Sequence, residues 1–296
     1  MKILSIYMNF PSSVALIIDD KVIAAVNEER FTRKKNDERF PIHSINFCLK
    51  KAGIKGKDLD GVALASFVSP FDDVIVRRSQ WSISDYLIEQ KKRWKPYLVD
   101  KKISKPKSLI DIFPKKIDFN QYPTAYWKKN YKDPKRNEKH CINRVEIIAN
   151  FLNISKDKIK RIDHHKAHAY YSYYTSNLIG KKTLALTADG IGDGLNATIN
   201  TFDKNCKFKR HYQTNICSIA RIYRYITLLL GMKPNEHEYK VMGLAPYGKK
   251  KYSLNSYNVF AETLKVSGTK FVWNIKPSDS YYWFKERLDG HRFDSI

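Results

Sequence analysis

The sequence predicts an α/β protein whose two halves repeat one order of elements. Each half contains a strand, a turn rich in small or polar residues, a second strand, a tight turn, a third strand and a helix with apolar spacing. The halves share this pattern without residue-level identity. Two such units facing each other would place two anion-binding turns across one cleft, an arrangement suited to holding a nucleotide.

The elements of the first half follow from strand alternation and helical spacing. The predicted strands are 3–8, 13–18, 22–27 and 62–66. Asp19, Asp20 and Lys21 form a hairpin turn signal between the second and third strands. Apolar residues at 42, 45, 49 and 52 predict a helix that ends at Gly53.

Residues 69–140 differ in character from the rest of the first half. They combine many lysines with tryptophans and tyrosines, and repeated prolines argue against long regular elements. We predict a helix at 82–95 within an otherwise irregular insertion or lid, followed by a helix at 141–152. Basic residues interleaved with aromatics also suit nucleic acid, but an acceptor-binding lid or a surface excursion is the preferred interpretation.

The second half repeats the pattern from residue 183. Its predicted strands are 183–188, 195–202 and 206–213, joined by turns at 189–194 and 203–205. A helix is predicted at 218–230, and glycines and a proline predict a constrained loop at 236–248. A helix near 256–266 and a strand at 270–274 complete the prediction.

Composition restricts the class of protein. The 296 residues suffice for two modest domains, and the formal charge of +24 favours anionic ligands unless it only reflects a lysine-rich composition. The four cysteines form no C-x-x-C pair, which indicates reduced thiols. The amino terminus lacks a secretory pattern, and no segment has the ~18 consecutive apolar residues of a membrane span. We therefore expect a cytoplasmic protein with no membrane partner.

Three of the eight histidines lie within residues 164–168. The segment 163–176 predicts one helix, with Asp163 as its N-cap. His164 and His168 share a face of that helix because they are four residues apart. Asp189 ends the following strand, so two imidazoles and one carboxylate could hold a metal ion with open positions for substrate oxygens. The alternative is a chance pair of histidines that make ordinary hydrogen bonds.

Glycines follow Asp189 at alternate positions, namely Gly190, Gly192 and Gly194. Closely spaced glycines let backbone N–H groups approach an anion, so we predict a phosphate-binding turn that includes Asp193. Further along the chain, Lys240 could neutralise a phosphate as a point charge. A solvated surface lysine is the alternative interpretation of Lys240.

Four blocks of sequence together resemble one family. The blocks are 27–35, 164–169, 188–193 and 238–248. They stand in the order found in carbamoyltransferases of the nodulation protein U, cephamycin and tobramycin type. The resemblance implies an actin-like ATPase fold of two ribonuclease-H-like lobes. It also implies transfer of a carbamoyl group from carbamoyl-adenylate, made from carbamoyl phosphate and ATP, to a hydroxyl of a sugar or secondary metabolite.

The resemblance assigns roles to individual residues. His164, His168 and Asp189 match the family's metal ligands, for a divalent ion such as iron, manganese or zinc. The glycines of the predicted phosphate turn match the family's own turn. Lys35 matches a basic active-site position that could hold carbamoyl or phosphate oxygens.

The sequence departs from the family in two respects. Phe10-Pro11 stand where the family has His-Asp, and the missing histidine is a candidate for proton transfer from the acceptor hydroxyl. The family's later Gly-Gly turn and its YrdC-like domain also have no counterpart. We therefore expect a first lobe at 1–180, an incomplete second lobe at 181–296 and a separate chain that carries the missing parts.

The leading functional prediction is the amino-terminal transfer part of a carbamoyltransferase that acts on a small-molecule or glycan acceptor. One alternative is a nucleotide- or metal-binding remnant that does not transfer the group. The other is a basic nucleic-acid-binding protein, whose affinity would fall steeply with salt.

Overall fold

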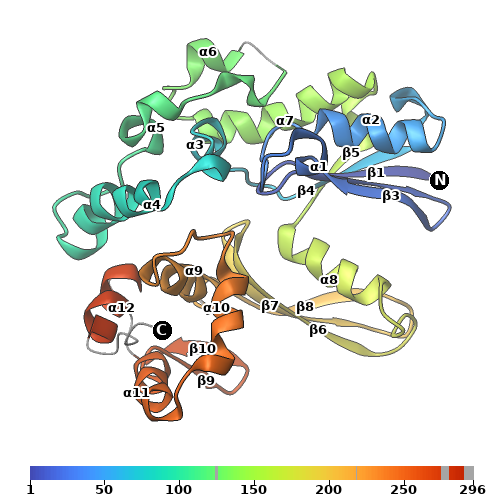
Figure 1. The fold of residues 1–296 in the computed structure, drawn as a ribbon. Coiled ribbons are helices and arrows are strands. Elements are labelled where there is room, and N and C mark those ends of the chain that lie inside the picture. The colour runs from blue at the N-terminus through green and yellow to red at the C-terminus, as the bar shows by residue number, and fades with distance from the viewer. Residues whose placement is uncertain (124–125, 218, 275–279, 290–296) are drawn as a thin grey trace. The chain divides into compact units, whose positions relative to one another are not determined.

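A computed structural model describes residues 1–123, 126–217, 219–274 and 280–289 (Figure 1). The chain divides into two compact units, one made of Met1–Trp81 and Ser108–Ala167 and the other of Ser82–Lys107 and His168–Ile296. Each unit contains its own β-sheet together with helices, which confirms the α/β class. The predicted lobe boundary after residue 180 stays a prediction. Parts of the predicted insertion (124–125), of the helix at 218–230 (Ser218) and of the second lobe (275–279 and 290–296) lie outside the described residues.

The first unit is built on five strands in the order β3-β2-β1-β4-β5. These are β1 (Lys2–Tyr7), β2 (Ser13–Ile18), β3 (Lys21–Asn27), β4 (Gly61–Ala65) and β5 (Ile159–Ile162). The first three strands form an antiparallel meander, and β4 and β5 extend the sheet parallel to β1. The four predicted strands are confirmed to within one residue. The alternation of apolar and polar residues does not predict β5, because only one of its four residues is buried.

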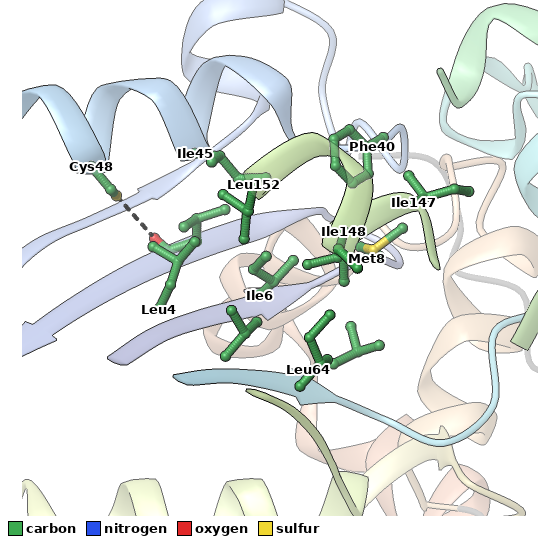
Figure 2. Packing of buried hydrophobic residues seen from close by; sticks show 14 of the residues in the cluster. Leu4, Ile6, Met8, Phe40, Ile45, Cys48, Leu64, Ile147, Ile148 and Leu152 are labelled. Carbon is green, nitrogen blue, oxygen red and sulfur yellow. Dashed lines mark hydrogen bonds between the residues drawn. The ribbon is translucent and has the colours of Figure 1, made fainter. Parts of the chain in front are cut away.

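Helices α2 (Ile42–Lys51) and α7 (Arg136–Leu152) bury the apolar face of this sheet. Figure 2 shows Leu4 and Ile6 of β1 packed with Ile45 of α2 and with Ile148 and Leu152 of α7. These side chains come from alternate strand positions and from one stripe of each helix. Hydrophobic periodicity therefore positions the core as predicted.

Helix α7 begins five residues before the predicted helix at 141–152. Tertiary contacts hold its first turn, since Arg136 Nε donates to Asp72 Oδ1 at 2.6 Å and Asn137 Oδ1 accepts from the backbone N–H of Phe71 at 2.9 Å. A pattern of apolar residues cannot report such polar contacts.

The shorter helices of the unit are α1 (Glu29–Thr32), α3 (Phe71–Ile75), α5 (Leu109–Ile112) and α6 (Tyr126–Asn130). Its 3₁₀ segments are η1 (Gly56–Asp58), η2 (Arg78–Gln80), η4 (Pro114–Lys116), η5 (Phe119–Gln121) and η6 (Lys156–Lys158).

The second unit has a three-stranded antiparallel sheet in the order β6-β7-β8 and a separate two-stranded ribbon. The strands are β6 (Thr183–Gly192), β7 (Leu195–Phe202), β8 (Phe208–Thr214), β9 (Leu264–Ser267) and β10 (Lys270–Trp273). The helical elements are α4 (Ile83–Glu89), η3 (Gln90–Val99), α9 (Ile219–Leu229), α10 (Glu238–Leu244), η7 (Ala245–Tyr247), α11 (Lys250–Ala261) and α12 (Ser280–Leu288). Helix α8 (His164–Tyr174) contains the division between the units.

Several predicted elements of the second unit are wrong in extent. The predicted turn at 189–194 is instead the end of β6 and a two-residue turn at Asp193 and Gly194, both with positive φ. The predicted loop at 236–248 contains α10, and the predicted helix at 256–266 lies at 250–261. The predicted helix at 82–95 is divided between α4 and the π-helical η3, which contains Pro96. The glycines and the proline within 236–248 lower its intrinsic helical propensity, and the folded chain is nevertheless helical at 238–244.

Glu38 is buried within the first unit, at 2% exposure. Its Oε1 accepts a hydrogen bond from the backbone N–H of Ser79 at 3.2 Å, while Oε2 makes no hydrogen bond to another described residue. Burial raises the pKa of this carboxyl to about 7, because removal from water penalises the ionised form. The protein therefore holds a neutral carboxylic acid below neutral pH.

The core of the first unit should respond strongly to truncation of β1. Ile6→Ala removes a fully buried side chain and should lower the free energy of unfolding by about 2–5 kcal/mol. Urea unfolding monitored by circular dichroism measures the change. The control is Val22→Ala on β3, where 66% of the residue is exposed and little change is expected. Equal effects of the two substitutions would contradict the described core.

Glu38 should make stability depend on pH. The carboxyl of Glu38 loses its proton near pH 4.5 in the unfolded chain and near pH 7 in the folded chain. Its contribution to the free energy of unfolding is therefore full below pH 4.5 and is lost as the pH rises to about 7. Glu38→Gln places a side chain that does not ionise at this position. The variant should therefore not show this decrease in the free energy of unfolding, which is up to about 3 kcal/mol. Urea midpoints at pH 5 and pH 8 should therefore show the variant gaining on the wild-type chain at the higher pH. A difference that does not vary with pH would refute the assignment.

Candidate functional site

The candidate metal centre begins at the amino-terminal end of α8. Asp163 Oδ1 accepts a hydrogen bond from the backbone N–H of Lys166 at 2.7 Å, so Asp163 caps the helix as predicted. His164 and His168 follow at the helical spacing that puts them on one face. The neighbouring His165 is fully buried.

Packing of α8 on the sheet brings Asp189 to the same helix. Ala169 and Tyr173 of α8 form one buried cluster with Ala185 of β6 and Phe202 of β7. The rings of Tyr173 and Phe202 stack with centroids 3.9 Å apart. Side chains at 185, 187 and 189 alternate onto one face of a regular strand, and the register shifts between Ala188 and Gly192, where β6 becomes irregular. Asp189 thus stands at the point where the strand leaves its regular pairing.

Three potential ligand atoms come together on α8 and β6. Those of His164, His168 and Asp189 all lie within 4.8 Å of one another. His168 Nε2 and Asp189 Oδ2 are 3.9 Å apart, and Asp189 Oδ1 accepts the backbone N–H of Gly190 at 2.6 Å. His168 is 53% exposed and Asp189 34%, so a ligand can reach them from solvent.

This donor set fits a divalent transition metal. Two imidazoles and one carboxylate suit iron, manganese or zinc and leave coordination positions open. Donor atoms bound to one ion at about 2.1 Å lie roughly 3 Å apart, so the three side chains must close slightly. The side chains of His168 and Asp189 are partly exposed, so their rotation can bring the ligand atoms closer together. The three residues lie close together, as the prediction requires, and their role as metal ligands stays a prediction.

The predicted phosphate turn has a different local structure. Gly192 pairs with Leu195, and only Asp193 and Gly194 form the connecting turn. A Cβ atom placed on Gly190 or Gly194 would meet no other atom within 4 Å, so the surface there is open. A phosphate-binding role for Gly190, Gly192, Asp193 and Gly194 stays a prediction.

The two predicted basic site residues are exposed and locally paired. Lys35 Nζ lies 3.1 Å from Glu29 Oε1, and its side chain is 63% exposed. Lys240 lies on α10, with Nζ 3.3 Å from Nε2 of His237. Both amino groups are therefore accessible to an anion, and their roles stay predictions.

Sequence reasoning did not single out Tyr7, whose ring lies 6.1 Å from that of His164. Tyr7 belongs to the face of β1 opposite Leu4 and Ile6, and it lines a groove of about 400 Å³ together with Asn27 and Arg30. The signal was present in the alternation of β1, where Ser5 and Tyr7 interleave with the core residues. A polar alternate face on a buried strand can mark a ligand-facing surface.

Comparison with known proteins gives a consistent result. The family described as "Carbamoyltransferase N-terminus" matches residues 2–281. An uncharacterized protein of Synechocystis is 28% identical over 81% of this chain and 34% of its own length. An uncharacterized protein of Methanocaldococcus jannaschii is 27% identical over 92% of this chain and 46% of its own. The nodulation protein NolNO of Sinorhizobium fredii is 26% identical over 86% of this chain and 30% of its own.

The chain spans less than half the length of each of these relatives. No helix in the part of the chain that the structure describes has the length and apolar character needed to cross a bilayer. Since the family match extends over nearly all residues, the chain belongs to the carbamoyltransferase family and corresponds to its amino-terminal region.

Proposed function

We propose that this chain is the transfer region of a carbamoyltransferase that uses carbamoyl-adenylate, made from carbamoyl phosphate and ATP. The acceptor is a hydroxyl of a sugar or secondary metabolite. The observation that supports the proposal most directly is the joint placement of His164, His168 and Asp189, the positions that match the family's metal ligands. Nucleic acid is a less suitable ligand, because the basic residues are spread along the chain without a long homogeneous tail.

The three candidate ligands would hold a divalent ion. Such an ion, when bound, polarises phosphate or carbonyl oxygens and offsets negative charge. Gly190 and Gly194 leave open surface beside Asp189, where phosphate oxygens of the donor could bind. The groove beside Tyr7 and Arg30 offers polar groups for the acceptor.

Lys35 would orient the carbamoyl or phosphate oxygens with its positive charge. Glu29 supports it, because Oε1 of Glu29 contacts Lys35 and Oε2 accepts the backbone N–H of Asn36 at 2.7 Å. This pairing holds the turn that presents the amino group. Phe10-Pro11 provides no proton acceptor for the hydroxyl, which is the observation that favours a binding remnant as the second candidate.

The proposed architecture is the actin-like one with duplicated lobes. Its support is the repeated order in which β1, β2, β3 and α2 in one unit correspond to β6, β7, β8 and α9 in the other. We propose a cytoplasmic location, with a small-molecule or glycan acceptor as the partner molecule.

Metal binding should depend on His168. Replacing it with alanine removes one of three ligands, and the affinity for Mn²⁺ or Zn²⁺ should fall by more than about 100-fold. Equilibrium dialysis with elemental analysis measures the bound ion. His211→Ala on β8 is the control, since this exposed histidine bonds instead to Thr201 Oγ1 at 2.7 Å. Unchanged metal content in the His168 variant would contradict the assignment of His168 as a metal ligand.

Carbamoyl transfer should depend on Lys35. The chain, loaded with metal, is mixed with separately prepared carbamoyl-adenylate and a panel of oligosaccharides and glycosides, and mass spectrometry detects the carbamoylated product. The Lys35→Met variant should transfer the carbamoyl group at least about tenfold more slowly, because it lacks the positive charge beside the reacting oxygens. The neighbouring Lys34→Met is the matched control.

Product formed by the wild-type chain and the Lys34 variant, but not by the Lys35 variant, supports the transferase. Metal binding with no product from any acceptor would instead favour the binding remnant.

A further inference from the structure

The first unit buries one arginine, Arg144 of α7, completely. Its Nη2 donates hydrogen bonds to two backbone carbonyls, that of Ser66 at 3.0 Å and that of Phe67 at 2.9 Å. Its Nε and Nη1 make no hydrogen bond to another described residue. Burial of a guanidinium without a carboxylate partner is costly. The two carbonyl contacts are therefore what an arginine contributes here and an apolar residue would not.

Two titratable groups that interact with Arg144 do not neutralise its charge. Tyr122 and His140 are both buried. Burial raises the pKa of Tyr122, and burial together with the positive charge of Arg144 lowers the pKa of His140 to about 3. Both groups are therefore uncharged at neutral pH. The guanidinium among them serves as a hydrogen-bond donor to the backbone.

The backbone that Arg144 holds is the exit segment of β4, which consists of Ser66 and Phe67. Ser66 has a φ of 82°. Residues other than glycine rarely adopt this left-handed region, and they do so where the surrounding structure holds them there. Ser66 is buried as well, so its carbonyl needs a partner within the protein. Arg144 supplies that partner and holds the strained segment in place.

The exit segment of β4 is joined to the end of β5. The backbone N–H of Ser66 donates to the carbonyl of Ile162 at 2.8 Å, which continues the parallel pairing of β4 with β5. The guanidinium carbon of Arg161 on β5 lies 5.7 Å from the ring centre of Phe67. Since β5 ends at Ile162 and α8 begins at His164, the exit segment is connected to the start of the helix that carries the first candidate metal ligand.

This segment also lies at the edge of the sheet where a ligand is expected. Strands β1, β4 and β5 are parallel, so their carboxyl ends meet at one edge. Tyr7 ends β1, and its ring lies 6.1 Å from that of His164. In open α/β sheets, ligands bind beyond the carboxyl ends of parallel strands. Arg144 therefore acts on the edge that carries His164.

We propose that Arg144 is a positioning residue for the candidate metal centre. Its guanidinium fixes the exit segment of β4, this segment fixes the end of β5, and the end of β5 sets the place of the His164 imidazole. The proposal rests on the proposed function, because it concerns the orientation of a ligand of that same site. Removal of a group that orients a metal ligand typically lowers metal affinity by about 10- to 100-fold.

The experiment measures metal affinity in two backgrounds. Arg144→Met removes the guanidinium and keeps an apolar side chain in its place, and it is made in the wild-type chain and in the His164→Ala variant. Titration with Co²⁺ measures the dissociation constant, and the visible absorption of the bound ion reports its coordination. Arg144→Met should weaken binding about tenfold in the wild-type chain. It should not weaken binding further in the His164→Ala variant, because the ligand through which it acts is then absent.

Two further variants separate positioning from a general loss of stability. Leu152→Ala truncates another buried side chain of α7, at the end of the helix beside Gly56 (Figure 2). It should lower the urea midpoint of unfolding without changing the affinity of the folded chain for Co²⁺. Arg144→Lys keeps the charge and a donor but not the planar guanidinium, so its loss of affinity should be smaller than that of Arg144→Met. If Arg144→Met does not fold, Arg144→Lys takes its place in the comparison of the two backgrounds.

Weaker Co²⁺ binding that requires His164, with an altered absorption spectrum, supports the proposal. Equal affinities of the wild-type chain and the Arg144 variant overturn it. An equal loss in both backgrounds, or the same loss in Leu152→Ala, also overturns it, because the effect would then be one of general stability. If the wild-type chain binds no Co²⁺, the metal centre of the proposed function fails and the role of Arg144 fails with it.

Discussion

The packing of α8 on β6 and β7 is the interaction on which the candidate site depends. Ala169 is fully buried and follows His168 directly, so its small side chain lets the helix lie close to the strand. The stacked rings of Tyr173 and Phe202 fix the helix one turn further along. A helix placed this way holds His168 near Asp189, and helical spacing holds His164 near His168. A slip of the strand by one residue would turn Asp189 to the opposite face.

A second constraint joins the segment around Lys35 to the core of the first unit. The buried Glu28 carboxylate accepts the backbone N–H of Ser44 at 2.9 Å and the Ser44 hydroxyl at 2.7 Å, near the start of α2. The carboxyl group of Glu28 thus satisfies one of the backbone N–H groups that have no partner within the first turn of the helix. The adjacent Glu29 pairs with Lys35. Two neighbouring glutamates thus have separate tasks, one anchoring the segment to a helix and the other orienting an exposed lysine.

Sequence reasoning succeeded where periodicity and local chemistry decide the structure. The strands of both meanders follow from alternation, and the apolar stripe of α2 follows from a spacing of about four residues. The Asp163 cap of α8 follows from the ability of its carboxylate to accept a backbone hydrogen bond. It failed where tertiary contacts decide, as in the first turn of α7, which Asp72 holds by an ion pair. It also could not show that β6 continues past Asp189, because glycines carry the same signal in a turn and in an irregular strand end. The closeness of His164, His168 and Asp189 agrees with their grouping in the sequence, and their role as metal ligands stays a prediction.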